Sequence, residues 1–176
     1  MISDEIRDLT VDPITGQVWI ATANGVSLMT PVAGPGVAPA DASIFTDFRN
    51  GIGNVRRIAV APLSDDVYFA TQNGLAWLQR ASGSVTTFRI NDGLPSNDVR
   101  DVAVDVVLIN GSNREIAWGA TALGLARVDA GRSIVAITTA DGPGTVPTND
   151  LRSVFVLADH TKVVGTVAGV FLYSGL

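Results

Sequence analysis

The chain contains the stretch Val99-Arg100-Asp101-Val102-Ala103-Val104, and its pattern of apolar-Arg-x-apolar-x-Val occurs at three other places. The arginines of the four copies are spaced by 49, 44 and 52 residues along the 176-residue chain. A pattern that recurs at a nearly fixed period indicates a repeat architecture, in which each copy forms one supersecondary unit. The other copies are Ile6-Arg7-Asp8-Leu9-Thr10-Val11, Val55-Arg56-Arg57-Ile58-Ala59-Val60 and Leu151-Arg152-Ser153-Val154-Phe155-Val156.

A second pattern follows the first in every unit: a β-rich run that ends in small-Thr-x-x-Gly-apolar. Its glycines are spaced by 49, 50 and 45 residues, at Gly25, Gly74, Gly124 and Gly169. Two independent patterns in constant order predict a repeat of about 48 residues that is present four times. We expect a single repeat domain over residues 1–176, with units at approximately 2–50, 51–93, 94–145 and 146–176.

Each unit reads as a series of short strands, because β-branched and aromatic residues cluster between turn residues. The first strand carries the Arg pattern, the second ends in the small-Thr pair, and a tight turn at the shared glycine leads to the third. A fourth strand is predicted at residues 43–48, 84–90 and 133–138, whereas unit four stops after its third strand. No segment shows a helical period. This organisation is typical of four-stranded antiparallel propeller blades.

We therefore predict an all-β fold, a β-propeller of about four blades whose last blade is incomplete. An ordinary β-sandwich is the alternative, but a sandwich needs no fixed period. Three arrangements stay open: part of a larger seven- or eight-bladed ring, a small four-bladed ring, or half of a dimeric eight-bladed ring. An open array would expose the apolar faces of its first and last blades. We favour part of a larger ring, with the assembling dimer as the next choice.

The composition excludes several classes of protein. Hydrophobic residues make up 47% of the chain and charged residues 16%, which excludes disorder. A net charge of −5 disfavours nucleic acid as a partner. With no cysteine and His160 as the only histidine, we predict no disulfide, no metal site and no cofactor. No signal peptide is visible, and no uncharged run reaches the roughly 20 unbroken apolar residues that span a bilayer.

One unit resembles a known family. The stretch Asp92-Gly93-Leu94-Pro95-Ser96-Asn97-Asp98-Val99-Arg100, followed by Ala117-Trp118-Gly119-Ala120-Thr121, is similar to the two-component regulator propeller repeat. Unit one shares these features, whereas units two and four diverge, with Tyr68 and Val163 in place of the tryptophan. The resemblance implies propeller blades in an extracellular or periplasmic module of bacterial two-component regulators, often a sensor that responds to saccharides.

The repeated arginines are the first candidate ligand-binding residues. Because they occupy equivalent positions at the start of the inner strand, a propeller would place them in a ring near one mouth of its channel. A ring of guanidinium groups can hold a carboxylate or sulfate through paired hydrogen bonds. The structural alternative is that each arginine pairs with an acid and fastens adjacent blades. The ring residues are Arg7, Arg56, Arg100 and Arg152, and the acids considered are Glu5, Asp98, Asp101 and Asp150.

The aromatic residues and the histidine are weighed in the same way. Trp19 and Trp118 fall at equivalent positions inside strands, which predicts packing between blades. Trp77 lies out of this register on a third strand and is the better candidate for stacking on a sugar. His160 sits beside Asp159 in a polar turn, and we expect it to be solvated.

These observations favour a non-catalytic ligand-sensing or protein-interaction module. The alternative is a structural or assembly module that completes its last blade with a strand from another chain. A propeller lyase or glycan-acting enzyme is less favoured. The expected partners are a saccharide or small anionic ligand, a second copy, or further blades of a larger parent protein. We expect no nucleic acid partner and no membrane insertion of this segment.

Overall fold

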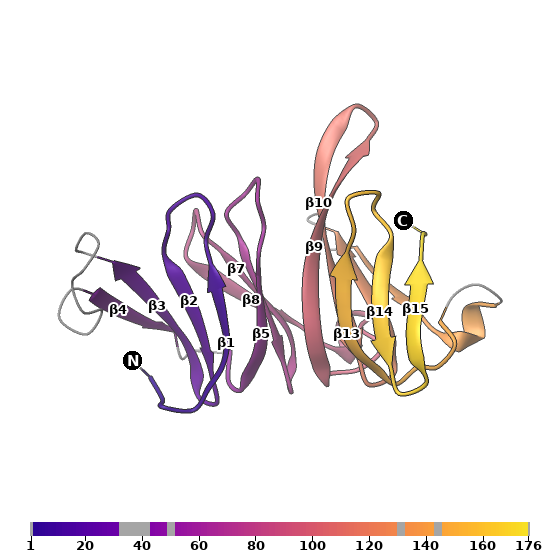
Figure 1. Ribbon diagram of the computed structural model, residues 1–176, viewed down its shortest axis with the longest axis horizontal. Helices are drawn as coiled ribbons and strands as arrows, with labels where there is room; N and C mark the ends of the chain where they lie inside the picture. The colour runs from indigo at the N-terminus through magenta and orange to yellow at the C-terminus, as the bar shows by residue number, and fades with distance from the viewer. Residues whose placement is uncertain (1, 32–42, 49–51, 130–132, 143–145, 176) are drawn as a thin grey trace.

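Four antiparallel sheets follow one another along the chain and lie side by side as the blades of an open propeller (Figure 1). The computed structural model describes residues 2–31, 43–48, 52–129, 133–142 and 146–175. Blades 1, 2 and 3 have four strands each and blade 4 has three, as the repeats predicted. The strands are β1 (Ile6–Val11), β2 (Val18–Thr22), β3 (Gly25–Pro31) and β4 (Ser43–Phe48) in blade 1; β5 (Val55–Val60), β6 (Val67–Thr71), β7 (Gly74–Gln79) and β8 (Ser84–Phe88) in blade 2; β9 (Val99–Ile109), β10 (Ser112–Thr121), β11 (Gly124–Asp129) and β12 (Ile134–Ile137) in blade 3; and β13 (Leu151–Val156), β14 (Lys162–Thr166) and β15 (Gly169–Tyr173) in blade 4.

The fourth strand of blade 2 is shorter than the sequence predicted. It ends at Phe88, and a 3-10 turn, η2 (Ile90–Asp92), replaces the expected extension to Ile90. The Asp92 carboxylate accepts a hydrogen bond from the Arg89 N–H at 2.8 Å, and Asn97 Oδ1 accepts one from the Ile90 N–H at 2.9 Å. These side chains satisfy backbone donors that the strand would otherwise use. A second 3-10 turn, η3 (Thr139–Asp141), follows β12. Within the described ranges, no helix is long and apolar enough to cross a bilayer.

A long hairpin distinguishes blade 3. The sequence predicted a longer excursion here, and in the structure β9 and β10 stay paired up to a tight turn, so that the hairpin projects beyond the other blades (Figure 1). Asn110 and Gly111 form the turn with positive φ angles of 51° and 76°. At the base of the hairpin, buried Glu115 accepts hydrogen bonds from the N–H groups of Leu63 (2.6 Å) and Ser64 (3.3 Å). The hairpin is therefore tied to blade 2.

The small-Thr-x-x-Gly pattern forms the same turn in every blade. In each turn the threonine hydroxyl donates to the carbonyl of the glycine, at 2.7–2.9 Å, and accepts from the N–H two residues on. A Cβ on Gly25 would lie 2.5 Å from the carbonyl oxygen of Phe48, because the fourth strand passes directly over the turn. At Gly169, where blade 4 has no fourth strand, nothing lies within 4 Å. The glycine thus serves close packing as well as the turn.

Apolar side chains fill the space between adjacent blades. Fully buried Trp19 lies in the core between blades 1 and 2 and contacts the rings of Phe48 and Phe69. Trp118 lies in the equivalent core between blades 3 and 4, against Tyr173. The predicted packing role of both tryptophans is therefore confirmed.

We expect Gly74→Ala to destabilise the protein far more than Gly169→Ala. Both glycines have positive φ angles, of 127° and 119°, so both variants pay a backbone strain of roughly 1–2 kcal/mol. Only the Cβ on residue 74 would also collide with a backbone carbonyl, that of Phe88, and such overpacking adds roughly 1–3 kcal/mol. Urea unfolding of both variants measures the difference. Equal losses would show that the fourth strand does not constrain this turn.

Candidate functional site

A β-bulge places each repeated arginine. In blade 1, Ile6 pairs with Thr22 and Asp8 pairs with Ala21, so that Arg7 has no partner on the neighbouring strand. A bulge of this kind bends the strand and redirects the side chain of the extra residue. The register shifts in the same way in the other three blades, at Arg56, Arg100 and Arg152.

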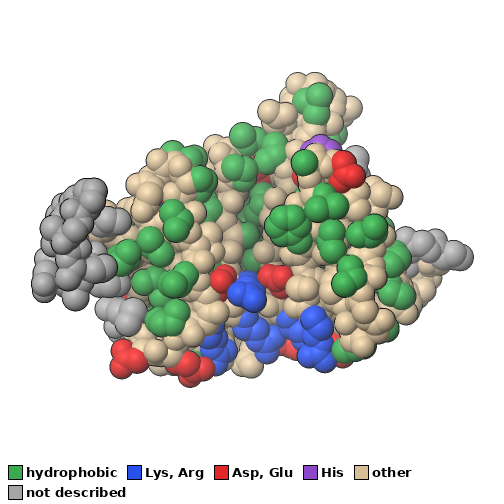
Figure 2. All heavy atoms as spheres, in the orientation of Figure 1, with side chains coloured by type: hydrophobic (Ala, Val, Ile, Leu, Met, Phe, Trp, Pro, Cys, Tyr) green, Lys and Arg blue, Asp and Glu red, His purple; other side chains and the backbone are tan. Residues whose placement is uncertain are grey.

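The redirected arginines connect successive blades. Each of the first three donates a hydrogen bond to the residue that stands two positions before the arginine of the following blade. The contacts are Arg7 Nη1 to Asn54 Oδ1, Arg56 Nη1 to Asp98 Oδ1 at 2.6 Å, and Arg100 Nη1 to Asp150 Oδ1. We call this set, with Glu5 and Arg152, the arginine ladder. Basic and acidic side chains gather along the lower edge of the view in Figure 2.

Acids of the same blade complete the arginine ladder, at Glu5 for Arg7, Asp98 for Arg100 and Asp150 for Arg152. Partial burial opposes the charge of Arg100, but hydrogen bonds to Asp150 and Asp98 outweigh it and raise the pKa of the guanidinium. The expected pairing with Glu5, Asp98 and Asp150 is thus observed, whereas Asp101 lies 3.9 Å from Arg57 instead. A ligand role for these arginines stays a prediction.

The residue after the bulge supplies a second contact between blades. Asp8 Oδ2 accepts from the Ile58 N–H of blade 2, and Asp101 Oδ2 accepts from the Val154 N–H of blade 4, both at 2.9 Å. Burial raises the pKa of Asp101, and the N–H groups that it accepts from oppose this effect. Sequence reasoning missed these contacts. The Asp at the same repeat position in units one and three was the available signal.

Trp77 is placed differently from the prediction. Its side chain belongs to the core between blades 2 and 3 and is only 5% exposed. The ring lies between Tyr68 and Phe88, with centroid distances of 6.1 and 6.2 Å, and its Nε1 donates to Asp66 at 2.9 Å. Both faces of the indole are therefore used inside the protein, which leaves no face for a sugar.

His160 was predicted to be solvated, but in the structure its side chain also pairs with Asp105. Its Nδ1 lies 2.8 Å from Oδ1 of Asp105, a buried carboxylate on β9, although half of the imidazole is exposed. Next to it, Lys162 is fully buried, with Nζ 4.4 Å from the ring centroid of Trp118, and it donates to the carbonyl of Gly175. Burial lowers the pKa of Lys162. This group fastens blade 4 to blade 3 at the end opposite the arginine ladder.

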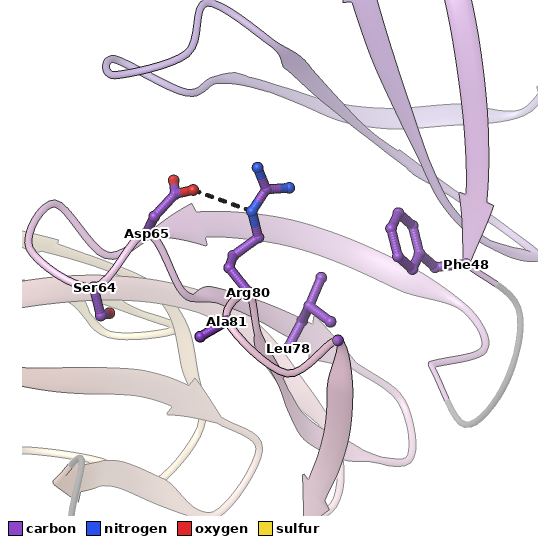
Figure 3. A pocket seen from close by; sticks show the side chains of 7 residues that line it. Phe48, Ser64, Asp65, Leu78, Arg80 and Ala81 are labelled. Carbon is purple, nitrogen blue, oxygen red and sulfur yellow. Dashed lines mark hydrogen bonds and ion pairs between the residues drawn. The ribbon is translucent and has the colours of Figure 1, made fainter.

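A cavity of about 500 Å³ opens between blades 1 and 2. Phe48 of blade 1 lines it on one side, and Leu78, Arg80 and Asp65 of blade 2 line it on the other (Figure 3). Arg80 Nε donates to Asp65 at 3.1 Å, and its guanidinium carbon lies 5.1 Å from the ring centroid of Trp19. The cavity thus combines an apolar wall with a fixed ion pair. We call it the interblade cavity; its further lining residues are Ser64, Ala81 and Gly83.

Asp65, the acid of the interblade cavity, has a raised pKa. Burial raises the pKa of Asp65, and the nearby carboxylate of Asp12 raises it further against the attraction of Arg80. Asp65 Oδ1 is buried with no hydrogen-bond partner among the described residues. Asp12 differs, because hydrogen bonds from Thr15 and from the Ile14 N–H outweigh its burial and lower its pKa. Sequence reasoning missed this site, since its residues follow no shared repeat pattern.

Comparison with known proteins gives the fold class. No family model matches the chain, and no curated protein sequence matches it. Among solved structures, the extracellular domain of BT4673 from B. thetaiotaomicron matches with a TM-score of 0.70 at 16% identity, over 98% of this chain and 22% of that one. That protein is described as a one-component or a hybrid two-component system.

Two further structures support the same fold. The WD40 propeller domain of Doa1 matches with a TM-score of 0.58 at 14% identity, over 95% of this chain and 49% of that one. Streptogramin B lyase matches with a TM-score of 0.63 at 14% identity, over 98% and 55%. The chain thus spans about a fifth of the BT4673 domain and about half of the other two. These matches confirm the β-propeller fold that the repeats predicted.

We expect Arg100→Gln to lower the free energy of unfolding by roughly 1–2 kcal/mol, because the variant removes charge-assisted bonds to Asp98 and Asp150 at a partly buried position. Arg114→Gln is the matched control, since Arg114 is exposed on the long hairpin, and its effect should stay within about 0.5 kcal/mol. Chemical denaturation of both variants measures this. A loss as small at residue 100 as at residue 114 would contradict a fastening role for the ladder.

Asp65→Asn should change how stability depends on pH. An acid whose pKa is raised by folding binds its proton more tightly in the folded state, so its contribution to stability grows as pH falls towards 4. Asparagine keeps the positive φ of 62° but does not titrate. The stability of the variant relative to the wild type should therefore decrease as pH is lowered from 7 to 4. Thermal unfolding across this range measures the difference, and a constant difference would contradict the raised pKa.

Proposed function

We propose that this chain is a non-catalytic sensing module of a β-propeller sensor and that the interblade cavity is its small-molecule site. The geometry of the cavity carries the proposal. The apolar side chains of Phe48 and Leu78 and the ion pair of Arg80 and Asp65 line a volume that suits a small ligand. The likeness to the extracellular domain of BT4673 supports the sensor role and an extracellular or periplasmic location.

The chemistry of the cavity fits a saccharide, including an acidic one. A sugar presents an apolar face that packs on an aromatic ring and hydroxyl groups that bond to charged side chains. Arg80 uses Nε and Nη2 for Asp65 and Gln17, whereas its Nη1 has no hydrogen-bond partner among the described residues. A hydrogen-bond donor of Arg80 thus lies beside the apolar lining of the cavity.

Thermal shift with a panel of neutral and acidic saccharides tests the proposal. A ligand at about 100 times its Kd adds about 2.7 kcal/mol of stability, which raises Tm by about 5–10 °C in a domain of this size. Ala81→Trp should abolish the shift by filling the cavity, because Ala81 is an exposed lining residue. Its neighbour Ser82 is also exposed but does not line the cavity, so Ser82→Trp should keep the shift.

Three other outcomes would count against this site. A shift that survives Ala81→Trp but is lost in Arg100→Gln would move binding to the arginine ladder. A shift that survives both substitutions would place the ligand elsewhere on the blades. No shift with any saccharide of the panel would contradict saccharide sensing by this chain.

A further inference from the structure

The first and last blades expose apolar sheet faces that no other blade covers among the described residues. We define the leading face as the outer face of blade 1, with Ile6, Leu9 and Val11. The trailing face is the outer face of blade 4, with Phe155, Val170 and Leu172. All six side chains are exposed. Hydrophobic side chains gather over both end blades in the space-filling view, with the charged ladder between them (Figure 2).

The leading face has the composition of a buried interface. Leu9 is 61% exposed, whereas its equivalents in the other blades, Ile58, Val102 and Val154, are each 6% exposed. Those three side chains lie in the cores that join each blade to the preceding one. Blade 1 therefore presents the surface that the later blades bury against a predecessor.

The trailing face is the complement of the leading face. Val170 is 74% exposed, whereas its equivalents Val26, Leu75 and Leu125 are fully buried against the following blade. Phe155 occupies the position at which the other blades carry Thr10, Ala59 or Ala103, and it is exposed as well. Blade 4 therefore presents the surface on which a following blade packs.

The charges at the two ends also match. In the arginine ladder, each arginine bonds to the residue two positions before the arginine of the next blade. Arg152 is the last arginine and is 56% exposed, with a bond only to Asp150 of its own blade among the described residues. By the same spacing, the residue of blade 1 that matches is Glu5, which is 63% exposed. The ends of one chain thus carry opposite charges at equivalent places.

We propose that a second copy of this chain packs its leading face on the trailing face of the first, and the reverse, to close a ring of eight blades. Each contact repeats the interface that already joins blades 1 to 4, with Arg152 of one copy beside the Glu5 position of the other. Two identical head-to-tail contacts close when a two-fold axis runs along the channel. The chain matches 49% of the WD40 propeller domain of Doa1, so two copies are about as long as that domain. This inference is independent of the ligand site.

Solution mass tests the proposal. Light scattering after size exclusion, from low to high micromolar concentration, should give twice the 18.3 kDa mass of the chain. A mass of 18.3 kDa at every concentration would overturn the proposal and assign the two faces to further blades of a longer protein. A series of larger masses would also overturn it, because it would show an open polymer in place of a closed ring.

Paired variants make the test specific for the two faces. Leu9→Asp on the leading face and Leu172→Asp on the trailing face should each give monomers, because both contacts of such a homodimer contain a damaged face. Mixed in equal amounts, they should recover the doubled mass through the one contact that combines two intact faces. Leu108→Asp, at an exposed site on the long hairpin, should remain dimeric.

The folding of each variant is checked by circular dichroism. Both substituted side chains are already exposed in the single chain, so neither change should unfold it. A folded Leu9→Asp variant that stays dimeric would contradict the assignment of the leading face. Failure of the mixture to recover a dimer from two folded monomers would contradict the head-to-tail arrangement.

Discussion

Each sheet of this protein is apolar on both faces, and a sheet of this kind is stable in water only when a neighbour covers each face. This constraint explains the stacking of blades, in which three cores are built from the facing residues of successive sheets. It also explains why the largest side chains, Trp19 and Trp118, are fully buried. The same constraint is unmet at the two ends of the described arc, where Leu9 and Val170 are exposed. The ends therefore have the chemistry of an interface.

Polar contacts between blades depend on one local irregularity. The bulge at each repeated arginine interrupts the pairing of the inner strand, and in blades 1 to 3 the arginine also bonds to the next blade. The following residue uses the same opening, as when Asp8 accepts the backbone N–H of Ile58. Apolar packing brings the blades together without fixing their register, whereas these directional bonds align one inner strand with the next. The arginine ladder thus follows the packing between blades, and both end at blades 1 and 4.

The candidate ligand site lies where blade 2 departs from the repeat. Arg80 and Asp65 are not repeated residues, and they meet Phe48 only because blades 1 and 2 are adjacent. Burial and the neighbouring Asp12 give Asp65 its raised pKa, so the electrostatics of the cavity also depend on contacts between turns that are far apart in the chain. The environment of Trp77, which lies out of register with Trp19 and Trp118, also depends on tertiary contacts. Its out-of-register position is explained by a bond to Asp66 and by packing between Tyr68 and Phe88, not by exposure.

The sequence by itself determined the repeat, the strands, the Thr-Gly turn and three of the four acids expected to pair with the arginines, because each depends on residues a few positions apart or on strict repetition. Only the tertiary structure decided which side chains are buried at the positions where the blades carry different residues. It buried Lys162 beside Trp118, paired His160 with Asp105 and opened the interblade cavity. The physical reason is that burial, cavity shape and pKa follow from the distance between side chains on separate blades. Sequence alone indicates which side chains of separate blades lie close together only where every blade carries the same residue at that position.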